Sequence, residues 1–272
     1  MNGDSFYLQC PSNASMHMFP NNKLSEYTIH LETPLEVGDA YEVGLCEIQY
    51  PQSWDNIRRG SNRLSTHLII KETDEVESNF DIEIPPGYYD SLPELMEKVR
   101  SSYTKNKEGE FELKGLKMIY NKTTRRVHVI ADKMRYMAND YQVTSSVTIT
   151  LKDDVARALG LQNGTKISTG ESIVSEFPAT VTGGFHQMYV YTDIIPPQPH
   201  PDGNVSILRT IAIDGKPNQE YLSKRFQNVY YMPLSRDIIS TISFAILDET
   251  GKRVGFNFGK VLLVLHFRKK RA

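Results

Sequence analysis

Short runs of alternating apolar and polar residues occur at both ends of this chain of 272 residues, and a helix-like pattern lies between them. Successive side chains of a β-strand point to opposite faces of a sheet, so a period of two predicts strands. The turn-forming residues, 17 glycines and 14 prolines, separate the runs, while 15 tyrosines and 11 phenylalanines favour strands over helices. Both ends of the chain are therefore predicted to form β-structure.

The two ends together contain enough predicted strands for one closed β fold. The final strand is typical, because Val261, Leu263, Leu265 and Phe267 occupy every second position. A tight turn is predicted after the strand that precedes it, and the segment after this turn is expected to pair back. The expected strands are 6–10, 27–32, 41–50, 188–195, 205–213, 238–247, 253–258 and 260–267. Eight or nine strands are the number that a β-sandwich or jelly roll requires.

The middle of the chain has a different pattern. Ser91 and Glu94 form a capping box, and the apolar residues after it recur at helical spacing, which predicts an amphipathic helix over 92–104. A second, short helix is expected over 153–159, with two acidic residues at its N-terminus. Further strands are expected at 67–71, 80–84, 117–120, 126–131 and 147–151.

We predict an all-β fold, a single jelly-roll β-sandwich with an inserted α+β domain. The jelly-roll domain is discontinuous and comprises residues 1–56 and 181–272, and the inserted domain comprises residues 57–180. Greek-key connections bring strands that are distant in sequence side by side, so strands from the two ends should share sheets. Such an insertion is tolerated because the entropy cost of closing a loop grows slowly with its length.

Composition excludes several classes of protein. The 31 Lys and Arg residues nearly balance the 33 Asp and Glu residues, so the whole surface is not expected to grip nucleic acid. Two cysteines are too few for a disulfide scaffold and are expected to behave as small buried hydrophobes. No apolar run approaches the roughly 18 residues of a membrane span, and the N-terminus has no signal-peptide pattern. We expect a soluble chain made in the cytoplasm.

No sequence pattern assembles a catalytic or metal site. A G-x-S-x-G elbow is missing, and Cys46 lies in the middle of a strand pattern, where nothing lowers the pKa of a thiol. The seven histidines stand singly, without metal-ligand spacing. We therefore predict a protein that is not an enzyme and that binds no cofactor or metal. The spacing argues against the alternative of a cupin-type enzyme, whose histidines converge on a metal.

A run of four cations, Arg268, Lys269, Lys270 and Arg271, follows directly on the last predicted strand. Three functions fit such a run. It could be a solubilising tail that protects a strand end, a contact with packaged nucleic acid or an acidic neighbour, or a nuclear-import signal. The sequence leaves these alternatives open.

Three aromatic residues are further candidates for contacts. Trp54, the one tryptophan, lies at a strand edge and is predicted to be either a core residue or an anchor in a subunit contact. Tyr88 and Tyr89 follow two prolines and a glycine, and are predicted to plug a strand end by packing. A carbohydrate or peptide site on these two tyrosines is the alternative.

Four blocks of sequence occur in a fixed order near the two ends. They contain Phe6-Tyr7-Leu8, Tyr41-Glu42-Val43-Gly44-Leu45-Cys46, Tyr191-Thr192-Asp193 and Val254-Gly255-Phe256. Together the blocks resemble the minor capsid (penton) proteins of Polinton (Maverick) and adintovirus-like elements, over roughly the first 55 and last 90 residues. The family tends to have a Val-Gly-Asp-like turn where this chain has Pro199-His200-Pro201-Asp202-Gly203, so the resemblance does not extend to the role of that loop.

The resemblance implies a structural protein of the virion. It implies one jelly roll that forms homopentamers at the five-fold vertices of an icosahedral capsid, beside a double jelly-roll major capsid protein. The chain would be made in the host cytoplasm, with assembly in the nucleus as an alternative. Weak contact of its basic tail with packaged DNA is one of the alternatives given above for that run. No catalytic residues come with the family. The alternative function is a glycan- or peptide-binding β-sandwich in host attachment, with residues 57–180 as its recognition head.

Overall fold

The computed structural model describes residues 4–71, 75–104, 111–131, 135–138, 141–143, 145–182, 185–201, 203–213 and 221–270. The chain divides into two compact units. The first unit combines Met1–Trp54 with Phe185–Ala272, and the second is Asp55–Gly184. These limits lie within four residues of the boundaries expected from the sequence. That each unit is an independent domain remains a prediction.

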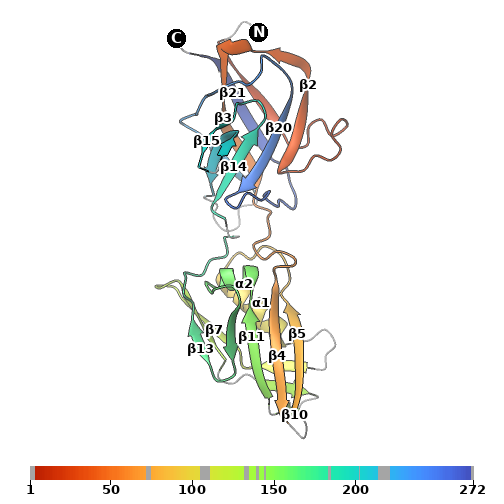
Figure 1. Cartoon of the computed structure of the whole chain (residues 1–272), viewed down its shortest axis with the longest axis vertical. Helices are drawn as coiled ribbons and strands as arrows, with labels where there is room; N and C mark the ends of the chain where they lie inside the picture. Colours follow the sequence, from red (N-terminus) through yellow and green to blue (C-terminus); the bar gives the residue numbers. More distant parts are fainter. Residues whose placement is uncertain are drawn as a thin grey trace. The chain divides into compact units, whose positions relative to one another are not determined.

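Two antiparallel sheets make up most of the first unit, and long strands from both ends of the chain lie side by side in them (Figure 1). One sheet has the order β1-β21-β3-β18, with the short β19 also paired to β3, and the other has the order β17-β14-β20-β2. Their bounds are β1 Ser5–Pro11, β2 Glu26–Glu36, β3 Tyr41–Pro51, β14 Gln187–Thr192, β17 Ile207–Ala212, β18 Tyr221–Arg225, β19 Met232–Pro233, β20 Ile238–Asp248 and β21 Leu262–Lys269. A small hairpin, β15 Gln198–His200 with β16 Gly203–Val205, completes the unit.

The strand order is that of a jelly roll. The eight main strands can be numbered from one to eight along the chain, leaving out the short β15, β16 and β19. One sheet then has the strand order 1-8-3-6, and the other has the order 5-4-7-2. Each sheet therefore takes strands from both ends of the chain, which confirms the predicted all-β jelly roll with an insertion. The insertion joins β3 to β14, the third and fourth strands.

The core of the first unit follows the alternation read from the sequence. In β21, Leu263, Leu265 and Phe267 are fully buried, while the residues between them are partly exposed. Tyr27 and Phe244 come from the opposite sheet and contact each other with ring centroids 5.2 Å apart. Burial of these large apolar side chains between two sheets is the main stabilising term of a sandwich.

The prediction of a strand at residues 253–258 is wrong. Its contact with the preceding strand is an isolated bridge between Leu247 and Arg253, and the rest is irregular. Val254 is 2% exposed, and the Phe256 ring packs against Tyr50 and Trp54. The alternation of apolar residues here reflects side chains that close the end of the core, not strand pairing.

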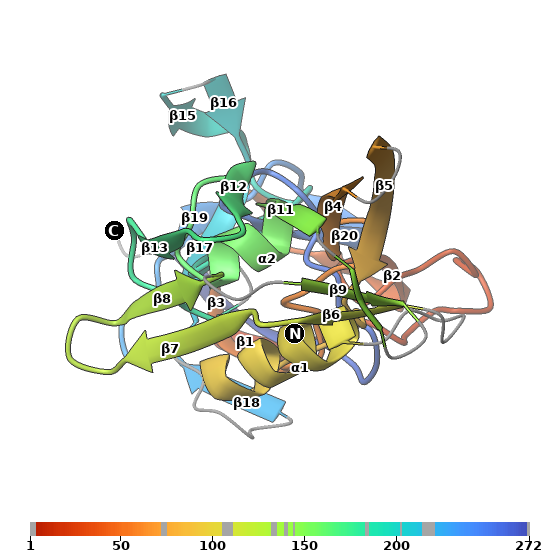
Figure 2. The same cartoon turned by 90° about the horizontal axis from the view of Figure 1, so that it is seen from below.

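The second unit contains three described sheets and two helices. The largest sheet has the order β12-β11-β4-β5, and β13-β8-β7 and β10-β9-β6 are smaller. Figure 2 shows α1 alongside β6 and β7, which belong to different sheets. The bounds are β4 Arg63–Lys71, β5 Glu75–Glu83, α1 Leu92–Thr104, β6 Phe111–Lys114, β7 Lys117–Asn121, β8 Arg126–Ile130, β9 Arg135–Ala138, β10 Tyr141–Val143, β11 Ser145–Leu151, α2 Asp153–Ala158, β12 Thr165–Ser168 and β13 Ser172–Val174.

Both predicted helices are present, α2 one residue shorter than expected. The capping box of α1 forms, because the Glu94 backbone N–H donates to Ser91 Oγ at 3.4 Å and the Glu94 carboxylate accepts from the Asp90 N–H at 3.0 Å. The buried face of α1 consists of Leu92, Leu95 and Val99, which lie in the hydrophobic core of the second unit. Helical spacing in the sequence therefore identified the side of α1 that faces the core.

A buried carboxylate ties α2 to the start of the second unit. Asp154 is 2% exposed and accepts hydrogen bonds from Arg58 Nε and Nη2 at 2.9 and 2.8 Å and from Arg157 Nη2 at 2.9 Å. Burial alone would raise the pKa of Asp154, but these hydrogen bonds outweigh it and hold that pKa below its ordinary value.

Replacing Asp154 with Ala should destabilise the protein by about 2–4 kcal/mol, because two arginines lose their buried partner. A lowered carboxyl pKa contributes stability above the unfolded pKa, about 3.9, and loses it as the pH falls through the folded pKa. The difference between variant and wild type in urea unfolding should therefore shrink below about pH 4. Glu97→Gln removes the exposed pair with Arg100 and should leave the midpoint unchanged. Equal loss in both variants would contradict this role for Asp154.

Candidate subunit interface

A row of aromatic side chains crosses the outer face of the β1-β21-β3-β18 sheet. We refer to Tyr7, His266, Tyr231 and Tyr230 as the aromatic row. The Tyr7 ring stacks on the His266 ring with centroids 4.4 Å apart, and the Tyr231 hydroxyl and His266 Nδ1 share a hydrogen bond of 2.6 Å. Tyr230 continues the row to Arg209 on β17, whose guanidinium lies 3.9 Å from the ring centroid. The row thus reaches from β1 to the opposite edge.

Strand register and one glycine produce this row. Tyr7 pairs with His266 in β21, and His266 pairs with Gly44 in β3. A Cβ atom on Gly44 would lie 2.5 Å from both the Tyr230 carbonyl oxygen and Val229 Cγ1. The segment 229–231 therefore rests directly on β3, which lets Tyr231 contact β21 while Tyr230 contacts β17.

Two arginines are held against the rings. The Arg268 guanidinium lies 3.4 Å from the centroid of the Tyr231 ring, and its Nε donates to Glu42 Oε1 at 2.6 Å. Arg209 also lies 4.2 Å from the ring of Phe226. A guanidinium over an aromatic face is attracted by the electron density of the ring. These contacts fix the orientation of both the row and the cations.

The surroundings favour the neutral forms of His266 and Tyr231, the two middle members of the row. Partial burial lowers the pKa of His266, and the charge of Arg268 lowers it further. Partial burial raises the pKa of Tyr231, against the opposing effect of Arg268. The middle of the aromatic row therefore favours uncharged rings, with the cations Arg268 and Arg209 beside the row.

The basic run has partners within the chain. Arg268 pairs with Glu42, and Lys269 Nζ lies 3.1 Å from Asp4 Oδ1. Lys270 donates its backbone N–H to the Ala40 carbonyl at 2.7 Å, and Arg271 lies outside the described residues. These contacts favour a tail that fastens the end of β21, since two of its charges already face carboxylates. Contact of the tail with packaged DNA stays a prediction.

Trp54 lies in the core of the first unit. It is 2% exposed and packs against Tyr50, Phe185 and Phe256 at ring-centroid distances of 6.4, 5.3 and 6.0 Å. The sequence predicted either a core residue or an anchor in a subunit contact at this position. The burial of Trp54 favours the core residue.

Tyr89 likewise packs within the chain. It is 6% exposed, and its hydroxyl donates to the Pro85 carbonyl at 2.7 Å. The Asn56 side chain bonds both the N–H and the carbonyl of Tyr89, at 2.9 and 2.8 Å. This geometry fits the predicted plug at the strand end, and Tyr88 beside it is half-buried.

The geometry of Cys46 does not favour nucleophilic chemistry. Its thiol donates to the Val264 carbonyl at 3.1 Å, and burial raises its pKa, whereas a reactive cysteine needs a lowered pKa. Among the described residues, no three His, Cys, Asp or Glu side chains gather as a metal site would require. Neither α1 nor α2 is long and apolar enough to cross a membrane.

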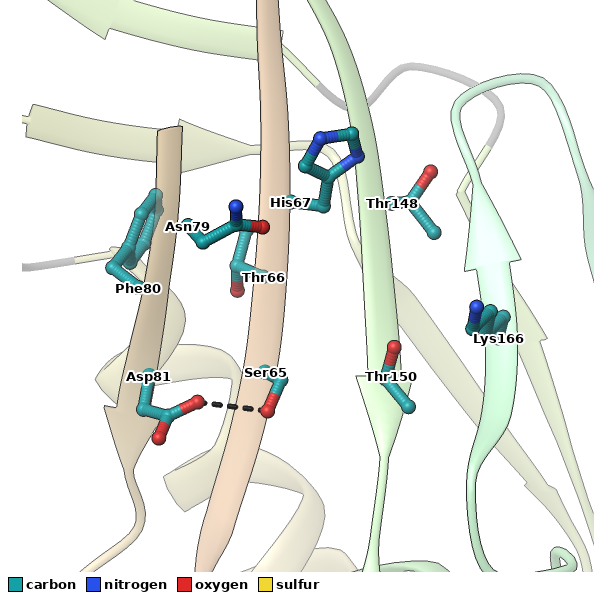
Figure 3. Close-up of a pocket in the computed structure, with 9 residues that line it drawn as sticks. All are labelled: Ser65, Thr66, His67, Asn79, Phe80, Asp81, Thr148, Thr150 and Lys166. Atoms are coloured by element: carbon teal, nitrogen blue, oxygen red, sulfur yellow. Dashed lines mark hydrogen bonds between the residues drawn. The ribbon is translucent and has the colours of Figure 1, made fainter. Parts of the chain in front are cut away.

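The second unit carries a polar hollow of about 630 Å³ on the outer face of its largest sheet (Figure 3). Side chains from four adjacent strands point into it, and Ser65 Oγ donates to Asp81 Oδ1 at 2.7 Å. The outward-facing residues are Ser65, His67, Asn79, Asp81, Thr148, Thr150 and Lys166. Hydroxyls, one amide, one carboxylate and one ammonium make this surface a set of hydrogen-bonding groups. The sequence analysis did not identify it.

Comparison with solved structures supports the fold. A chain in the cryo-EM structure of the Sputnik virophage matches 99% of this chain and 99% of its own length, with a TM-score of 0.51 and 11% identity. The selenomethionine-labelled mavirus penton protein matches 98% of this chain and 100% of its own length, with a TM-score of 0.49 and 10% identity. No protein-family model matches the sequence. No curated protein matches it. At 11% identity the likeness to the virophage chain establishes a shared fold.

Replacing Gly44 with Ala should displace the segment 229–231 and cost about 1–3 kcal/mol of stability, because the added Cβ overlaps a backbone carbonyl. The Tyr231–His266 hydrogen bond should break with it, which NMR of the His266 ring would report. Gly255→Ala is the matched control, since a Cβ there has no heavy atom within 4 Å. A G44A variant as stable as G255A, with an unchanged His266 signal, would contradict this account.

Proposed function

We propose that this chain is a minor capsid (penton) protein that forms homopentamers at the five-fold vertices of an icosahedral virion. The observation that supports this best is the jelly roll itself, matched over 99% of its length, insertion included, by a chain of a virophage structure. The four sequence blocks that resemble Polinton and adintovirus-like minor capsid proteins lie on this jelly roll. The proposed neighbour is a double jelly-roll major capsid protein.

The surface chemistry agrees with a role in assembly. A closed ring of identical subunits needs two different, mutually complementary patches on each subunit. Aromatic residues and arginine are enriched at protein interfaces, and both occur in and beside the aromatic row.

Native mass spectrometry of the purified protein should show a pentamer of about 155 kDa, five times the 31.0 kDa chain. Co-expression with a double jelly-roll major capsid protein should yield icosahedral particles, and electron microscopy should show additional density at their five-fold vertices. A chain that stays monomeric at all concentrations and is absent from such particles would refute the proposal.

The polar hollow favours a second candidate function, binding of a glycan or peptide during host attachment. Its hydroxyl, amide and charged groups match the hydrogen-bonding groups of such ligands. If this is correct, a glycan array should give a ligand, and Asp81→Ala should weaken its binding at least about tenfold, since a hydrogen bond to a charged group contributes about 1.5–3 kcal/mol. Lys117→Ala, an exposed change on β7, is the control. An array and a peptide library without any ligand would eliminate this candidate.

A further inference from the structure

We propose that the two ends of the aromatic row, Tyr7 on one edge of the jelly roll and Tyr230 on the other, meet between neighbouring copies of this chain. The contact would be head to tail, with Tyr7 of one copy against Tyr230, Arg209 and Arg225 of the next. This inference rests on the proposed homopentamer and identifies the surfaces that build it.

The side chains at the two ends of the row are exposed, whereas those in its middle are partly buried. Tyr7 is 66% exposed and Tyr230 is 61% exposed, while Tyr231 and His266 between them are partly buried. Exposed aromatic side chains are enriched at protein interfaces. The row therefore has unused contact area at its two ends and not along its length.

These ends lie at opposite edges of the sandwich. Tyr7 is on β1, the first strand in the order β1-β21-β3-β18. Tyr230 contacts Arg209 on β17, which is the edge strand of the other sheet, and the Lys224 ammonium of β18 donates to the Ala212 carbonyl of β17 at 3.2 Å. Strands β17 and β18 thus form one side of the sandwich, and β1 is the far edge of its sheet.

The two ends also lie at the same level along the strands. The register places Tyr7, His266 and Gly44 in one line across three strands, and the Tyr230 carbonyl lies against Gly44. In a ring whose axis runs along the strands, contacting patches must share one height, because an offset would give an open helix instead of a closed ring. A row perpendicular to the strands meets this condition.

The chemistry of the two ends is complementary. One face of the Tyr7 ring stacks on His266, and its exposure leaves the other face open. At the β18 side, the Arg225 side chain is 82% exposed and its partner Glu47 is 13% exposed, so the guanidinium can approach an incoming ring. Cation–π contacts suit this arrangement. Because both halves of the pair belong to the same chain, a second copy fits better than a foreign partner.

The test is the assembly state of surface variants, measured by native mass spectrometry beside the wild type. Tyr7→Ser and Tyr230→Ser should each weaken pentamer formation at least about tenfold, as the loss of a central aromatic contact does. Phe258→Ser removes a side chain of similar exposure, 60%, and should leave the pentamer intact. Thermal unfolding checks that each variant is folded, and Arg225→Glu replaces Tyr230→Ser if that variant is not.

Mixing the two variants tests the direction of the contact. Tyr7→Ser keeps an intact Tyr230 end and Tyr230→Ser keeps an intact Tyr7 end, so the mixture should give a dimer containing one of each. This inference would be overturned by pentamers in both single variants or by a mixture without mixed dimers. It would also be overturned by a Phe258→Ser variant that loses pentamer formation to the same extent. A wild-type protein that forms no pentamer would instead refute the proposed function.

Discussion

Antiparallel pairing between the two ends of the chain is the contact on which the first unit depends. The final strand, β21, lies between β1 and β3 and is hydrogen-bonded to both. Its inward-facing residues, Leu263, Leu265 and Phe267, are fully buried, and without it β1 would have no partner in its sheet. Such long-range pairing predicts slow folding compared with a fold of local contacts.

The sequence predicted strands whose large apolar residues alternate, and it failed where that signal is weak or misleading. Tyr221–Arg225 forms β18, but Leu222 is its one aliphatic residue, so this segment lacks the alternation that predicts a strand. Residues 253–258 have the opposite problem, because Val254 and Phe256 alternate yet close the core from an irregular segment. Alternation reports which side chains are buried, and hydrogen bonding with a neighbouring strand is a separate property.

The candidate interface could be predicted far less well than the fold. Tyr7 lies between the partly buried Phe6 and Leu8, and His266 lies between the buried Leu265 and Phe267. This alternation with apolar residues indicates from the sequence that both face outwards. Their stacking depends on the register of β1 against β21, which no local pattern encodes. Tyr230 and Tyr231 come from a segment without regular structure, and its position depends on the space left by Gly44. The basic run was the more visible signal, but two of its charges, those of Arg268 and Lys269, pair with carboxylates within the chain.

The position of the insertion allows the two units to change separately. The chain leaves the jelly roll after β3, and the aromatic row crosses that strand at Gly44, near its middle. Each unit has its own buried core, and no residue belongs to both. The strands that carry the row are fixed by pairing within the first unit, so residues on the outer face of β4, β5, β11 and β12 can vary without altering it. If the aromatic row is the assembly surface that we propose, a protein built this way can keep that surface while the outer face of its insertion varies in sequence.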